Sequence, residues 1–160
     1  MPATRTGVDT VTALLVTADD LLTEGPDAEG PLTPAGRDRG AAYALRIALE
    51  AAVDAALATE EAGLGELRSM RAKLLCLHHY ASPAPARRAH ALWNRLSAAC
   101  KYHHDELGPT RAQVCAWRSA VEKLATELAA PPTPPRFPRQ AGTGRPPAEV
   151  TAAEDCRDGL

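Results

Sequence analysis

Residues 33–61 read TPAGRDRGAAYALRIALEAAVDAALATEE, a segment rich in alanine and leucine. Alanine is the best helix former, and Thr33 followed by Pro34 suits the cap and the first position of a helix. Apolar side chains recur here at intervals of three and four residues, the period of one buried helical face. The inward positions are expected to be Leu45, Leu49, Ala52 and Ala56. The segment therefore predicts a long helix, which Gly63 and Gly65 end.

Four other segments carry the same periodicity and predict helices over residues 8–24, 66–80, 86–107 and 110–130. The last opens with Thr110 and has Gln113 three residues later, which is a capping box. A turn is expected at Ser82-Pro83-Ala84-Pro85. Aligning the apolar faces of the last two helices predicts an antiparallel hairpin, with Trp117 near Cys100 and Trp93 near Leu124 or Leu128.

One domain is expected, because 160 residues fit the size of a single core. Aromatic residues make up only 4% of the chain, so leucine, valine and alanine must form that core. The prediction is an all-α bundle of about five helices over residues 8–130. Residues 1–7 are expected to be disordered. Residues 131–160 hold seven prolines and few large apolar side chains, so we expect a disordered proline-rich tail.

The N-terminus has no apolar run typical of a signal peptide, and no segment has the roughly 18 apolar residues of a membrane span. We therefore expect a cytoplasmic protein without membrane contact. In that compartment its four cysteines are thiols. The abundance of alanine, arginine and proline is typical of a GC-rich bacterial genome.

Common enzyme signatures are missing from the chain. It has no phosphate-binding G-x-x-x-x-G-K, no G-x-G-x-x-G, no H-E-x-x-H, no G-x-S-x-G and no C-x-x-C. These absences favour a protein that is not an enzyme, and no cofactor is expected.

Charged residues are unevenly distributed, although the formal net charge is only −2. There is no acidic residue between Glu66 and Asp105, whereas residues 1–66 hold twelve acids and four bases. All five histidines lie in or beside the acid-free segment. Its basic residues are Arg68, Arg71, Lys73, Arg87, Arg88, Arg95 and Lys101. The sequence thus predicts a basic pair of helices next to two acidic ones.

The basic pair of helices has three interpretations. One is a surface for phosphate or an acidic protein partner, in an interaction or regulatory module. The second is a surface for nucleic acid, although few aromatic residues are available for base stacking. The third is that the acidic helices neutralise the basic ones within the bundle, which leaves only a solvated face.

Arg71 and His78 are seven residues apart, so they lie on one helical face about two turns apart. This pair resembles the R-x(4–6)-H motif of HEPN-type helical-bundle ribonucleases. The resemblance implies a homodimer that cuts RNA without metal. His78 would move a proton and Arg71 would hold the phosphate. The chain differs from the family at Ala72, where a polar residue is usual, and in carrying the motif on a central helix.

Cys76 with His79, and Cys100 with His103, each form a C-x-x-H pair. Four such ligands suit zinc. In an antiparallel hairpin, however, the two pairs lie on the order of 15–20 Å apart along the helix axes. No metal site is therefore expected.

Overall fold

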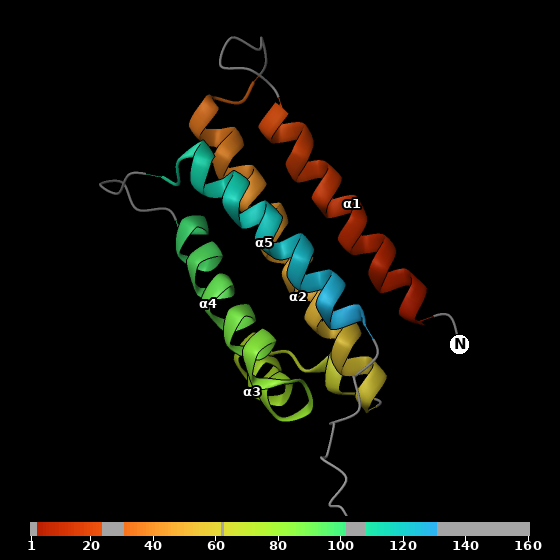
Figure 1. Cartoon of the computed structure of the whole chain (residues 1–160). Coiled ribbons are helices and arrows are strands. Elements are labelled where there is room, and N and C mark those ends of the chain that lie inside the picture. The colour runs from red at the N-terminus through yellow and green to blue at the C-terminus, as the bar shows by residue number, and fades with distance from the viewer. Residues whose placement is uncertain (1–2, 24–30, 62, 102–107, 131–160) are drawn as a thin grey trace, which may run out of the picture.

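Four long helices alternate in direction along the bundle (Figure 1): α1 (Ala3–Thr23), α2 (Pro34–Glu60), α4 (Pro83–Cys100) and α5 (Arg111–Ala129). Between α2 and α4 the chain forms a 3₁₀ turn, η1 (Leu64–Glu66), and the short helix α3 (Met70–Tyr80). This computed structural model describes residues 3–23, 31–61, 63–101 and 108–130. Those residues contain no strand, so the all-α fold with five α-helices is confirmed.

Helix α2 lies at the centre and contacts every other helix. Its buried side chains are therefore not confined to one stripe, since outer helices cover it from several sides. Leu45, Leu49, Val53 and Leu57 are fully buried, and so are the small residues Ala41, Ala42 and Ala48. The small residues let neighbouring helices approach closely, and the leucines fill the space between them. A core of leucine, valine and alanine is thus confirmed.

The cap residues explain where the helices begin. The Thr33 hydroxyl accepts from the backbone N–H of Gly36 at 3.1 Å, and Pro34 occupies the first turn of α2. At α5, the Thr110 hydroxyl accepts from Gln113 N while the Gln113 side chain accepts from Thr110 N, which confirms the capping box. Gly63 takes a left-handed conformation, φ 95°, directly before η1 and after the end of α2. Glycine adopts that backbone without strain.

Helix α1 begins at Ala3, earlier than the expected Val8. The reason is packing against α2. A Cβ added at Gly7 would lie only 3.0 Å from the Ala55 Cβ, so the two helices approach closely where Gly7 has no side chain. Docking on α2 supports an extra helical turn that the local sequence does not specify.

Two further helix starts differ from the expectation. Helix α3 begins at Met70 and not at Glu66, because the Ser69 hydroxyl accepts from Ala72 N and caps the helix there. Helix α4 begins at Pro83, within the segment expected to be a turn. Prolines in a first turn remove only N–H groups that have no partner inside the helix. This helix ends at Cys100 and not near Leu107 as expected, because Lys101 has an extended backbone and caps the helix there. The proline-rich tail lies outside the described residues.

The expected antiparallel hairpin of α4 and α5 is present. Trp117 borders the same cavity as Ala98 and Ala99, one turn from Cys100. Trp93 is partly buried, and its indole N–H donates to Glu50 Oε1 on α2 at 2.9 Å. The hydrogen bond between Trp93 and Glu50 connects α4 to the central helix α2. None of the described helices combines the length and the apolarity that a membrane span requires.

Candidate functional site

The outer face of α3 carries an exposed leucine between a cation and two histidines. Arg71, Leu75, His78 and His79 follow each other at intervals that place them on one side of the helix. All four are exposed, and Leu75 is 68% exposed. The opposite side of α3 buries Leu74 and Leu77 against the core. We call Arg71, Leu75, His78 and His79 the α3 face.

Most of the basic residues of the acid-free segment carry an unpaired charge. Lys73 pairs with Asp54 on α2 at 2.6 Å, and Arg88 pairs with Glu127 on α5 through two contacts of 2.6 and 2.7 Å. The other five have no ion pair or hydrogen bond through the side chain among the described residues, and all five are exposed. They are Arg68, Arg71, Arg87, Arg95 and Lys101. These cations are available to a ligand or a partner.

Two acids of α1 and α2 form ion pairs with arginines of α5. Arg118 on α5 holds Asp19 on α1 through two contacts of 2.7 and 2.8 Å, which raises the pKa of Arg118. Arg111 donates to Asp38 at 3.0 Å and to the Leu22 carbonyl at 2.8 Å. Within the described residues, Lys73 with Asp54 is the one ion pair between α3 or α4 and the acidic helices. Neutralisation inside the bundle therefore leaves the basic helices largely charged.

The two residues of the ribonuclease resemblance, Arg71 and His78, both lie on the α3 face. Their spacing separates them by about 10 Å along the helix axis. Neither side chain has a hydrogen-bond partner among the described residues, and both open to solvent and not into a cavity. In a single chain they lie on a convex surface. A cleft around them would need a second molecule, as the resemblance implies.

The cysteines and histidines do not gather into a metal site in the part of the chain that the structure describes, where no three His, Cys, Asp or Glu side chains are grouped for a metal. Cys76 is partly buried, and His79 of the same C-x-x-H pair is exposed. His103, the predicted partner of Cys100, lies outside the described residues together with His104.

Cys100 is expected to react more slowly with iodoacetamide than Cys115. Burial raises the pKa of the Cys100 thiol, against the opposing effect of Arg46. At about pH 7.5 the thiol is then mostly protonated, and the thiolate is the reactive form. Cys115 is exposed on α5. Alkylation followed over time by peptide mass spectrometry measures both rates. If Cys100 and Cys115 are alkylated at equal rates in the folded protein, and the ratio of the two rates is the same after denaturation, Cys100 is not shielded.

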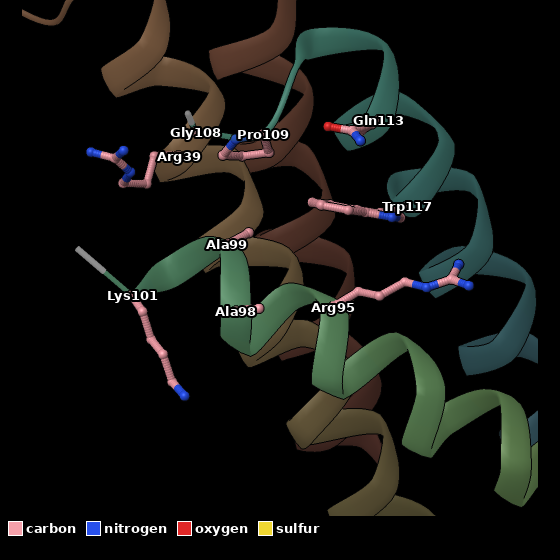
Figure 2. A pocket seen from close by; sticks show the side chains of 9 residues that line it. All are labelled: Arg39, Arg95, Ala98, Ala99, Lys101, Gly108, Pro109, Gln113 and Trp117. Atoms are coloured by element: carbon pink, nitrogen blue, oxygen red, sulfur yellow. The ribbon is translucent and has the colours of Figure 1, made fainter. Parts of the chain in front are cut away.

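The structure also reveals groups that sequence reasoning missed. A cavity lies where the end of α4, the start of α5 and the start of α2 meet, and Arg39, Gln113 and Trp117 are among its lining residues (Figure 2). The sequence pattern places Trp117 on the apolar face of the last helix and says no more about it. Arg39 belongs to the acidic part of the sequence. No local signal joins them, because they lie on different helices.

Tyr80 is a second such group. It donates to Glu61 at 3.1 Å, and this hydrogen bond, together with the negative charge of Glu61, raises the pKa of the tyrosine. The contact ties the end of α3 to the end of α2.

Comparison with known proteins adds no family to these observations: no family model, no curated protein and no solved structure matches the chain.

Proposed function

We propose that the protein is a non-enzymatic interaction module that binds an acidic protein partner through the α3 face. The observation that carries this proposal is the exposed Leu75 beside Arg71, His78 and His79. A single exposed leucine is ordinary on a protein surface. Here it lies in a stripe of cationic and titratable side chains, with the unpaired Arg68 just before the helix. An apolar anchor beside arginine and histidine side chains matches a partner segment with acidic and apolar side chains.

A protein partner accounts for this surface better than nucleic acid does. Aromatic side chains that stack on bases are scarce on α3 and α4. Trp93 is turned toward Glu50, and the Tyr80 hydroxyl is bound to Glu61. Leu75 has no role in binding phosphates, whereas a leucine anchor is common in helix-to-groove and helix-to-helix contacts. Nucleic-acid binding and RNA cleavage are the two alternatives that the experiment separates.

Leu75→Asp is expected to weaken binding to the partner at least about tenfold, because it places a carboxylate where the apolar anchor docks. The partner is first recovered from the host by crosslinking and mass spectrometry. It is then purified, and its affinity is measured by calorimetry. Val16→Asp is the matched control, since Val16 is exposed on α1, at 53%, and lies on a helix that contacts neither α3 nor α4. Equal affinities of the two variants would contradict the proposal.

The same preparations are then tested on single-stranded RNA. We expect neither cleavage nor binding at physiological salt. Metal-independent cleavage that is lost in His78→Ala would replace the proposal with the HEPN-like ribonuclease. RNA binding without cleavage would replace it with a nucleic-acid-binding protein, provided that the binding weakens in Arg71→Ala and depends less on salt concentration in that variant.

A further inference from the structure

The cavity between α2, α4 and α5 has a volume of about 320 Å³. Its apolar wall consists of Trp117 together with Pro109, Ala98 and Ala99 (Figure 2). The close-up shows the flat indole ring reaching from α5 toward the end of α4. Ligand sites usually measure about 300–1,000 Å³, so this cavity suits a small molecule with one flat apolar part.

Cationic side chains stand around this apolar wall. Arg39 comes from α2, Arg95 from α4, and Lys101 caps the C-terminal end of α4. In Figure 2 the charged ends of Arg39 and Lys101 extend outward from the opening, and Arg95 extends toward α5 below Trp117. None of the described lining residues is acidic. Arg95 and Lys101 have no ion pair among the described residues, so their charge attracts an anion to the opening.

Two polar groups of α5 remain available at the cavity. The Gln113 side-chain oxygen accepts from Thr110 N, which leaves the amide NH₂ as a donor. The indole N–H of Trp117 has no acceptor among the described residues, unlike that of Trp93, which is bound to Glu50. The cavity thus offers a flat aromatic surface and neutral donors, with positive charge distributed around its opening.

From this arrangement we propose that the cavity binds a mononucleotide. The base stacks on the indole of Trp117, which supplies affinity without reading the sequence of a longer nucleic acid. The positive charge around the opening attracts the phosphate, with Arg95 on one side and Lys101 on another, and Arg39 contributes further positive charge. This site is separate from the α3 face, so the proposal does not depend on the identity of a protein partner.

Titration with AMP and ADP tests the proposal, followed both by calorimetry on the wild-type chain and by Trp fluorescence. The chain holds two tryptophans, so Trp93→Phe makes Trp117 the one reporter. Stacking is expected to quench this emission saturably. Adenosine lacks the phosphate and inorganic phosphate lacks the base, so each is expected to bind at least about tenfold more weakly than AMP. A benzoate-type aromatic acid that binds as well as AMP would show a general aromatic-anion site and overturn the assignment to nucleotides.

Arg95→Gln and Lys101→Gln are each expected to weaken AMP binding about twofold to threefold, because each removes one exposed positive charge from the opening. Arg87→Gln is the matched control, because Arg87 is an exposed, unpaired arginine of the same helix that does not line the cavity. Leu75→Asp should bind AMP normally, which separates this site from the α3 face. Absence of saturable binding to the wild type would overturn the proposal. So would unchanged affinity in both Arg95→Gln and Lys101→Gln.

Discussion

Asp38→Ala is expected to lower the free energy of unfolding by about 2 kcal/mol, because it removes a largely buried carboxylate that accepts a charge-assisted hydrogen bond from a partly exposed arginine. Asp38 is only 8% exposed and accepts from Arg111 at 3.0 Å. Arg111 also donates to the carbonyl of Leu22, so a single side chain of α5 joins the end of α1 to the start of α2. Without the carboxylate, the partly desolvated guanidinium loses this charge-assisted hydrogen bond.

Chemical denaturation followed by circular dichroism measures this loss. Asp20→Ala is the control, since Asp20 is an exposed acid of α1 without a partner among the described residues, and a change of less than about 0.5 kcal/mol is expected. The Asp38→Ala and Arg111→Ala double-mutant cycle isolates the pair. A coupling energy near zero would mean that Asp38 contributes through its local helix and not through Arg111.

Leu49→Ala is expected to cost about 3–4 kcal/mol, the cost of deleting a large side chain from a site that cannot collapse. Leu49 is fully buried on the central helix, whose neighbours on several sides hold the cavity open. A loss of this size lowers the melting temperature of a bundle this long by about 10 °C.

Leu75→Ala makes the same chemical change at a side chain that is 68% exposed, and we expect it to alter the stability by less than about 0.5 kcal/mol. The two variants are compared by calorimetric melting. Similar melting temperatures would show that α2 repacks around the missing side chain, and that the alanines around Leu49 do not form a rigid frame.

The fold could be predicted where local signals agree. Thr33, Pro34 and the spacing of leucines and alanines specify α2, and the capping box specifies the start of α5. The starts of α1 and α4 could not be placed in the same way. The contact of Gly7 with Ala55 depends on tertiary structure. The two prolines after Ser82 are compatible both with a turn and with a first helical turn.

The candidate site was predicted less completely. The acid-free segment identifies the candidate basic residues, because a run of charge is visible in the sequence alone. The sequence does not show which of these basic residues form ion pairs, because their partners lie far away in the chain. The contacts of Arg111 with Asp38 and of Arg118 with Asp19 span 73 and 99 residues. The cavity beside Trp117 likewise exists only once three helices have docked.

The pairing of α5 with the acidic helices leaves positive charge on α3 and α4 and exposed carboxylates such as Asp9 and Asp20 on α1. Helix α1 contacts neither α3 nor α4, so the two kinds of charge lie on separate parts of the molecule (Figure 1). The protein therefore has an electric dipole moment that its net charge of −2 does not reveal. A negatively charged partner within a Debye length of about 8–10 Å orients the protein, with α3 and α4 toward the partner, before any contact forms. Such pre-orientation raises the association rate constant. Added salt is therefore expected to lower the association rate constant more than it raises the dissociation rate constant.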